Sequence, residues 1–508
     1  MLRTVASVGG FTLISRVLGF IRDILIAAIL GAGPVADAFF VAFRLPNHFR
    51  ALFAEGAFNA AFVPMFSGIL ERNGRDAARA FADLIFTILL VTQIILLAVF
   101  LIGMPWFMYV FAPGFADDPA KFDMTVLFTR ITFPYLLFIA LVSLLGGVLN
   151  SLGKFWAAAA APILLNLCLI AALLELTPLL PTPGHALAWG VFAAGIAEYA
   201  LLAWEAKRNG FWLRIEKPKM SPEMKKFFKL LGTASIGAGI VQVSMFFDTL
   251  IASFLPNGAI SYLYYADRIN QLPLGVIGIA VGTVLLPELS RHVSRDDHGA
   301  ALHSQNRAVE LSLFLTLPAA AAFVVIAGPI VAALFERGEF TAADSAAAAM
   351  TLTAYAIGLP AFVLQRSFLP GFYARGDTAT PVKVAGATVA ANIAMKLVLV
   401  WPFAQVGLAA ATSFAGWINL ALLFLIMRRR GWFAFDKRTA RNAPRIALSA
   451  GIMTAALLLF QYLGGGYFDT TVMHDRLMFL VFLVAVGLAA FSVPALVFGL
   501  ARRSAPSS

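Results

Sequence analysis

This sequence contains few groups that carry charge or bind metal. Only 13% of its 508 residues are charged, whereas soluble domains average about a quarter. There is one cysteine, Cys168, so an intrachain disulfide is excluded. The six histidines are scattered along the chain and form no spacing typical of metal ligands. We therefore expect no metal site, no cofactor and no disulfide framework.

Apolar residues dominate instead. They make up 60% of the chain, which is more than a soluble core can bury. Lipid must then be the solvent, and we predict an all-α polytopic membrane protein with about 14 transmembrane helices. The apolar segments are 8–31, 34–67, 80–104, 125–150, 157–176, 185–206, 227–255, 259–290, 308–335, 345–373, 381–402, 406–427, 443–463 and 477–500.

Two of these segments are longer than one crossing and contain helix-breaking residues. Segment 34–67 includes Pro46 and Pro64, and segment 259–290 includes Pro273. We interpret both as broken or bent helices, which a membrane tolerates only where the backbone lines a cavity or packs on protein.

Basic residues are concentrated in alternate loops. The loops near 207–229 and 428–445 are rich in Lys and Arg, whereas the opposite set of loops contains only Lys121, Arg337 and Arg476. The positive-inside rule places the basic set in the cytoplasm, together with both termini, in a multi-pass inner-membrane protein. The net charge of +11 therefore reflects topology rather than nucleic-acid binding, although such loops also attract anionic membrane lipids.

The two halves of the chain resemble each other at one nearly constant offset. The matches are Arg44 with Arg268, Pro64 with Pro287, Phe111 with Phe335, Pro134 with Pro360, Gly147 with Gly371, and Asn166 with Asn392. Each repeat would hold about six spans, so both would insert in the same orientation, with a substrate site between them.

This repeat predicts the domain organisation. We expect an N-lobe at 1–210, a basic cytoplasmic linker at 211–226 and a C-lobe at 227–430. Residues 431–508 lie outside the repeat and would add two C-terminal helices and a short tail. The two six-helix lobes would surround a central cavity.

The first two spans carry a dense group of charges. Its members are Arg16, Arg22, Asp23, Asp37, Arg44, Arg50 and Glu55. Facing lipid, they would together cost on the order of 15 kcal/mol or more, so they must line an aqueous cavity or pair with each other. Asp248, Asp267 and Arg268 occupy corresponding positions at the start of the second repeat.

Two interpretations of this cluster are open. The charges could be buried ion pairs that lock helices together, and their near balance is compatible with that. Their density favours a functional site, because a packing lock needs one pair. The planar guanidinium binds phosphate oxygens bidentately, so we expect an anionic ligand, a phosphate or diphosphate. For Arg130 and Arg366 taken singly, both interpretations remain.

The N-terminal residues resemble a known family. The runs GFTLISRVLGFIRD at 10–23 and ADAFFVAFRLPN at 36–47, continuing through Arg50 to Val63-Pro64, are similar to the first-helix signatures of the MurJ (MviN) family of lipid II flippases. The resemblance extends over the whole chain. It implies the multidrug/oligosaccharidyl-lipid/polysaccharide (MOP) exporter fold and a role in peptidoglycan and cell-wall biogenesis in the bacterial inner membrane.

The resemblance also implies a substrate and residues required for transport. The substrate would be lipid II, an undecaprenyl-diphosphate-linked disaccharide-pentapeptide, moved from the cytoplasmic to the periplasmic leaflet by alternating access. A transporter of this kind makes and breaks no bond, so it is not an enzyme. Contact with other cell-wall synthesis proteins would accompany this role. The implied residues are Arg16, Arg22, Asp23, Asp37, Arg50 and Arg268.

We hypothesise two roles for the charged residues. Arg16, Arg22 and Arg268 would engage the diphosphate, and Arg50 would capture the headgroup or pair with Glu55. The carboxylates would hold the arginines or form gate pairs. These carboxylates are Asp23, Asp37, Glu55, Asp248 and Asp267.

Some members of the family bind sodium between the seventh and eleventh spans. Asp248 and Asn392 match that pattern, but Lys396 stands where a carboxylate is expected one turn later. A cation in that place argues against sodium, so we expect no such site here.

Other functions remain as alternatives. The closest is a flippase for another polyprenyl-diphosphate oligosaccharide. A cation-coupled drug exporter would need a cavity dominated by carboxylates and aromatic residues. A membrane transferase acting on polyprenyl lipids would need paired catalytic carboxylates, and none stands out. A scaffold for cell-wall enzymes would leave the intramembrane charge unexplained.

Overall fold

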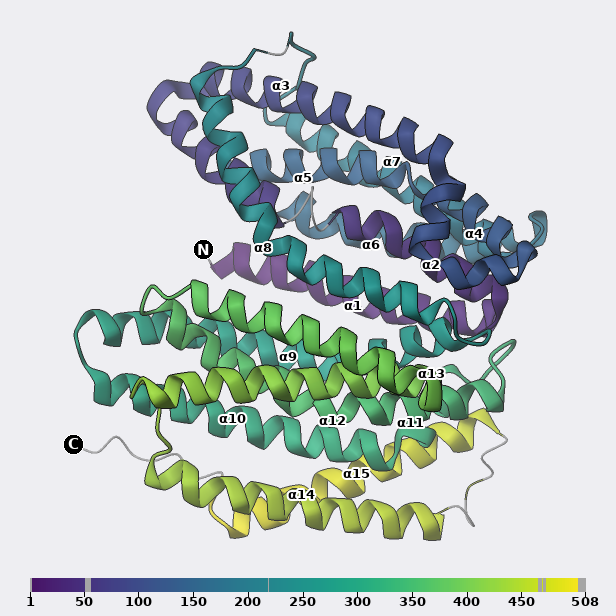
Figure 1. The fold of residues 1–508 in the computed structure, drawn as a ribbon, viewed down its shortest axis with the longest axis vertical. Helices are drawn as coiled ribbons and strands as arrows, with labels where there is room; N and C mark the ends of the chain where they lie inside the picture. Colours follow the sequence, from purple (N-terminus) through teal and green to yellow (C-terminus); the bar gives the residue numbers. More distant parts are fainter. Residues whose placement is uncertain (1, 51–55, 218, 465–467, 469–471, 501–508) are drawn as a thin grey trace. The chain divides into compact units, whose positions relative to one another are not determined.

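The computed structural model describes residues 2–50, 56–217, 219–464, 468 and 472–500. Over these residues the chain is helical and contains no strand, which confirms the predicted all-α class. Nine of the described helices are long and apolar enough to cross a membrane. In Figure 1 the helices are labelled, and their colours follow the chain from the N-terminus to the C-terminus.

The chain divides into two compact units. The first contains residues 1–261 and 337–340, and the second contains residues 262–336 and 341–508.

Up to residue 252, the described residues of the first unit form eight α-helices. They are α1 (Leu2–Leu30), α2 (Pro34–Arg50), α3 (Gly56–Phe111), α4 (Pro119–Thr132), α5 (Tyr135–Ser151), α6 (Trp156–Ala171), α7 (Pro183–Arg208) and α8 (Pro222–Ala252). Short turns of helix follow α3 at Pro113–Asp117 and α6 at Ala172–Leu176 and Thr177–Leu179. Helix α3 contains one non-helical residue, Gly74, with φ of 80°.

Aromatic packing joins α8 to α3 in the first unit. Phe227 of α8 makes edge-to-face contacts with Phe58 at 5.9 Å and with Phe81 at 6.4 Å between ring centroids. Phe62 stacks on both Phe58 and Phe66. Large buried rings account for much of an apolar core's stabilisation, and here they hold α8 beside α3.

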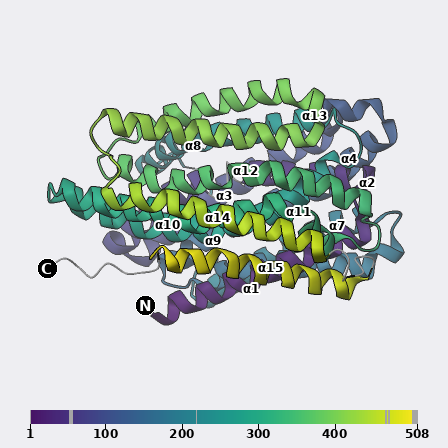
Figure 2. The ribbon, with the colours of Figure 1, turned by 90° about the horizontal axis from the view of Figure 1, so that it is seen from below.

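Helix α9 (Ala259–Ser294) begins in the first unit, which extends to residue 261, and continues in the second unit. The second unit also contains α10 (His298–Val325), α11 (Ala327–Phe335), α12 (Ala342–Tyr373), α13 (Ala379–Arg429), α14 (Lys437–Gly464) and α15 (Met473–Val497). Helix α12 packs on α13 and α10, while α14 packs on α15 and α10. Figure 2 shows α14 running alongside α15. Helix α13 contains one non-helical residue, Ala404, with φ of 47°.

Prolines lie inside helices in both segments that we expected to be broken or bent. Segment 34–67 corresponds to α2, which contains Pro46, and the start of α3, which contains Pro64, and the residues between them, 51–55, lie outside the described part. Helix α9 continues through Pro273 and Pro287. A proline removes one backbone hydrogen bond, and within α9 this loss does not end the helix.

Candidate functional site

The predicted Arg22 and Asp23 form a buried ion pair on α1. The Arg22 Nη2 lies 2.7 Å from the Asp23 Oδ1, and the Arg22 Nε donates to the same oxygen at 3.0 Å. Their side chains are only 6% and 4% exposed. Asp23 therefore neutralises Arg22 in this structure.

Asn166 of α6 completes the Arg22 environment. Its Oδ1 accepts a hydrogen bond from the Arg22 Nη1 at 2.9 Å, while its Nδ2 donates to the Ser15 carbonyl at 2.9 Å. A Cβ on Gly19 would already touch the Asn166 amide at 3.5 Å. Small residues allow this close approach of helices. The repeat singled out Asn166, but not as a partner of Arg22.

Arg16 has different surroundings on the same helix. It is exposed and forms no hydrogen bond or ion pair with any residue that the structure describes. It lines a cavity of about 510 Å³ beside α1, α5 and α6. The polar lining residues are Thr12, Ser15, Arg16 and Asn150, and the apolar ones are Val8, Phe155, Ala158, Ala159 and Pro162.

Asp37 lies at the centre of a second buried cluster. Its carboxylate accepts hydrogen bonds from the Lys121 Nζ at 3.0 Å, the Gly258 N–H at 2.8 Å, and the Ser261 N–H and hydroxyl at 3.0 and 2.7 Å. Asp37 is 1% exposed. A carboxylate at the first turn of a helix satisfies free N–H groups and favours the positive end of the dipole, so Asp37 caps the start of α9.

Lys121 was not among the predicted site residues. It is 3% exposed, and its ammonium also donates to the Asn257 Oδ1 at 2.8 Å and lies 4.0 Å from the centre of the Phe115 ring. The charge pattern of the sequence assigns Lys121 to a loop, whereas it lies in the first turn of α4. The available signal was Asp37 itself, because a buried carboxylate requires a partner.

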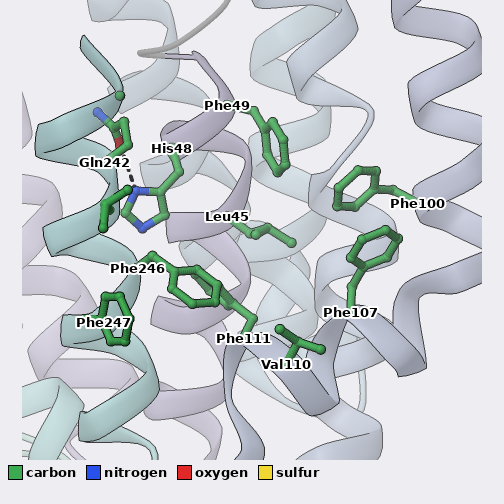
Figure 3. A pocket seen from close by; sticks show the side chains of 12 residues that line it. Leu45, His48, Phe49, Phe100, Phe107, Val110, Phe111, Gln242, Phe246 and Phe247 are labelled. Carbon is green, nitrogen blue, oxygen red and sulfur yellow. Dashed lines mark hydrogen bonds between the residues drawn. The ribbon is translucent and has the colours of Figure 1, made fainter. Parts of the chain in front are cut away.

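A second cavity in the first unit is apolar. It has a volume of about 550 Å³ and is lined by residues of α2, α3 and α8. In Figure 3, Phe49, Phe100 and Phe107 lie around the cavity, opposite a hydrogen bond between His48 and Gln242. That bond joins the His48 Nδ1 to the Gln242 Oε1 at 2.9 Å and links α2 to α8.

The remaining predicted residues of the first unit lie near the apolar cavity or at the end of a helix that lines it. Asp248 of α8 and Arg44 of α2 both act electrostatically on the His48 ring. Arg50 is the last residue of α2 and is partly buried. Glu55 lies outside the described residues, so the expected contact between Arg50 and Glu55 stays a prediction.

Arg268 and Asp267 are adjacent residues of α9 in the second unit. The Arg268 Nη2 donates to the Tyr264 hydroxyl at 3.1 Å, and its guanidinium lies 4.9 Å from the centre of the Tyr264 ring. The Asp267 carboxylate accepts a hydrogen bond from the Gln271 amide. A cation over an aromatic face is stabilised by the ring quadrupole, so Tyr264 orients Arg268.

The other basic residues within the predicted spans have different surroundings. Arg130 donates to the Leu101 carbonyl at 3.1 Å. Arg366 crosses α9 at Gly278, where a Cβ would lie 2.7 Å from the Arg366 Cδ. Lys396 is 1% exposed. Among the described residues, no group of three His, Cys, Asp or Glu side chains could hold a metal ion.

A chain of apolar helices that buries paired charges and turns an arginine toward a cavity is built like a membrane transport protein. The family model described as lipid II flippase MurJ matches residues 26–492. A probable lipid II flippase MurJ of Rhizobium meliloti (strain 1021) is 45% identical over 99% of this chain and 95% of its own length. The corresponding protein of Vibrio cholerae is 37% identical over 98% of this chain and 96% of its own.

Solved structures agree on the fold. The structure titled lipid II flippase MurJ, inward closed conformation, matches with a TM-score of 0.81 and 24% identity, over 97% of this chain and 99% of that one. An inward-facing MATE transporter of the MOP superfamily matches with a TM-score of 0.69 and 14% identity, over 82% and 94%. The chain belongs to the lipid II flippase MurJ family.

Proposed function

We propose that this protein is a lipid II flippase. It would move the undecaprenyl-diphosphate-linked peptidoglycan precursor from the cytoplasmic to the periplasmic leaflet by alternating access. The observation that carries this proposal is the 45% identity over nearly the full length to a probable lipid II flippase MurJ. The protein is accordingly a transporter rather than an enzyme.

The proposed topology has about 14 spans, with both termini in the cytoplasm of a bacterial inner membrane. Support comes from the 54-residue span candidate Phe58–Phe111 and the 51-residue Ala379–Arg429. At 1.5 Å per residue each would be roughly 80 Å long, more than twice the hydrocarbon thickness. Each also contains a non-helical residue, Gly74 or Ala404, where we place the loop between two crossings.

The proposed lobes are 1–210 and 227–430, joined by the linker 211–226 and followed by 431–508. Two pairs of matched residues have similar structural positions, which supports the repeat on which this division is based. Phe111 is the last residue of α3, and Phe335 is the last residue of α11. The matching Asn166 and Asn392 are both buried, at 5% and 7% exposure.

The proposed substrate site uses Arg16, Arg22 and Arg268 for the diphosphate and Arg50 for headgroup capture. Arg16 supports this assignment best, because an exposed guanidinium beside a cavity is available to bind phosphate oxygens. Arg22 would exchange its Asp23 partner for diphosphate in another state of the cycle. The proposed gate pairs involve Asp37, Glu55, Asp248 and Asp267.

Contact with other cell-wall synthesis proteins belongs to the same proposal. A precursor delivered to the periplasmic leaflet is the substrate of the enzymes that polymerise it.

Depletion of the protein tests the function. We expect lipid II to accumulate in the cytoplasmic leaflet and the cells to lyse. Loss of surface polysaccharide with intact growth would instead identify a flippase for another polyprenyl-diphosphate oligosaccharide.

Variants of the arginines test the site. Arg22→Ala and Arg268→Ala, expressed at the level of the unmodified protein, should each reduce lipid II arrival at the outer leaflet by at least about tenfold, as expected when a charge-assisted contact is lost. Normal arrival with both variants would refute the diphosphate assignment.

A further inference from the structure

The cavity beside Arg16 is also lined by uncharged polar side chains. Arg16 and Thr12 come from α1, whereas Asn150 comes from the end of α5. Asn150 is exposed, and its side-chain amide forms no hydrogen bond within the part of the chain that the structure describes. The cavity therefore combines one cation with an amide that offers both donors and an acceptor.

The local electrostatics divide this cavity into two regions. Arg16 supplies a positive charge on α1. Asn150 lies in the last turn of α5, where backbone carbonyls give the helix end a partial negative charge. The Thr12 hydroxyl donates to the Val8 carbonyl at 2.9 Å, so it offers its lone pairs as acceptors. An anion fits beside Arg16, and neutral hydrogen-bond donors fit the α5 side of the cavity, between Asn150 and the acceptor lone pairs of Thr12.

The turn after α5 holds Asn150 and Phe155 in place. The Lys154 N–H donates to the Leu149 carbonyl at 2.8 Å, and the Gly153 N–H donates to the Asn150 carbonyl at 3.0 Å. With Gly153 at φ of 73°, this is the Schellman arrangement that ends a helix. Phe155 follows directly and is 38% exposed at the cavity.

Small residues of α6 leave the space open. Ala158, Ala159 and Pro162 line the cavity where larger side chains would fill it. A volume of about 510 Å³ falls within the ordinary range of ligand sites, about 300–1,000 Å³.

We propose that this cavity is a saccharide subsite, in which Asn150 and Thr12 bind the sugar next to the diphosphate while Phe155 covers its apolar face. This inference rests on the proposed flippase function. Sugar hydroxyls and acetamido groups are neutral donors and acceptors, which matches the α5 side. An anionic phospholipid shares the phosphate but has no sugar, so the two ligands can be separated.

The test measures binding of two ligands to the full-length protein by native mass spectrometry in detergent. One ligand is lipid II, and the other is undecaprenyl diphosphate, which lacks sugar and peptide. Asn150→Ala should weaken lipid II binding about fivefold, as expected for one neutral hydrogen bond, and leave undecaprenyl diphosphate binding unchanged. Arg16→Gln should weaken binding of both.

Two further variants test the space itself. Ala159→Leu should fill the cavity and weaken lipid II binding more than undecaprenyl diphosphate binding. Leu167→Phe, at a 44% exposed position of the same helix, is the control and should change neither. Thermal melting of each variant shows whether it is folded.

Three results would overturn the subsite. These are an unchanged lipid II affinity in Asn150→Ala, an equal loss for both ligands, or displacement of lipid II by equimolar phosphatidylglycerol. If the unmodified protein binds lipid II no better than phosphatidylglycerol, the proposed function fails as well. Normal lipid II binding with an unaffected Asn150→Ala variant refutes only the subsite.

Discussion

Two arginines on α1 meet different surroundings although their chemistry is the same. Arg22 is enclosed by Asp23 and Asn166, whereas Arg16 is exposed beside a cavity. A buried guanidinium needs a counter-charge and hydrogen-bond acceptors, and Arg22 has both. Arg16 forms no ion pair with any described residue, so its guanidinium is available to a ligand. The two residues should therefore respond differently to substitution.

The Arg22–Asp23 pair predicts a stability effect that is separate from transport. Asp23→Asn should destabilise the protein by about 3–5 kcal/mol, because it leaves a buried arginine without its counter-charge. The double variant Arg22→Met, Asp23→Leu should regain part of that loss. Thermal melting in detergent measures both. Leu13→Ala, at a 64% exposed position of α1, is the control. Equal melting temperatures for Asp23→Asn and Leu13→Ala would contradict the prediction.

Asp377, in the loop between α12 and α13, predicts a pH effect. Hydrogen bonds from the Thr380 side chain and N–H, and then from Arg430, hold the pKa of this carboxyl well below its ordinary value. A depressed pKa contributes stability above the unfolded value of about 4, and this stability is lost as the pH falls through the folded pKa.

Asp377→Asn should therefore melt at a lower temperature than the unmodified protein at pH 6 and at pH 4. The difference should shrink only as the pH falls further below 4. Melting curves across this range test it, and a difference that vanishes above pH 5 would show that the pKa is not depressed.

At the scale of helices, close packing depends on a few glycines. Gly358 of α12 faces Ser413 of α13, whose hydroxyl donates to the Ala354 carbonyl at 2.6 Å. A Cβ on Gly358 would lie 2.6 Å from the Ser413 Oγ and 2.7 Å from its Cα. In a membrane, small residues drive such contacts because apolar burial does not distinguish protein from lipid.

Gly358→Ala should destabilise the protein by about 1–3 kcal/mol, because the clash with the Ser413 backbone cannot be relieved by a side-chain rotation. Gly386→Ala is the matched control in α13, since a Cβ there meets nothing within 4 Å. The control should be neutral or stabilising by up to about 1 kcal/mol. Equal melting temperatures for the two variants would count against this packing.

At the scale of the whole molecule, the number of crossings decides where each loop lies. In the proposed topology, α3 contains the end of the second crossing, 34–67, and the whole of the third, 80–104, with Gly74 in the cytoplasm and the turn at Pro113–Asp117 in the periplasm. The basic residues Arg72, Arg75 and Arg79 surround Gly74, in agreement with the positive-inside rule.

Alkaline phosphatase fusions test this topology, because the enzyme is active only in the periplasm. A fusion after Gly74 should be inactive, one after Asp117 active, and one after Arg430 inactive. An active fusion at the C-terminus would exclude an even number of spans.

The sequence alone was sufficient for the membrane class and the helical fold, and it singled out the arginine cluster as a candidate site. Hydropathy and the cost of burying a charge are properties of single residues and short segments, so no contact map is needed to apply them. The motif at 10–23 also led to the family, which the full-length relatives confirm.

Only the tertiary structure decided which charges are partnered. Arg16 and Asp23 are seven residues apart and so lie on one face of α1, but the structure pairs Asp23 with its neighbour Arg22. The other partners are distant in sequence: Asn166 lies 144 residues from Arg22, and Lys121 lies 84 residues from Asp37. A long, flexible cation can reach several acceptors, and its choice depends on which helices pack together, which no local pattern specifies.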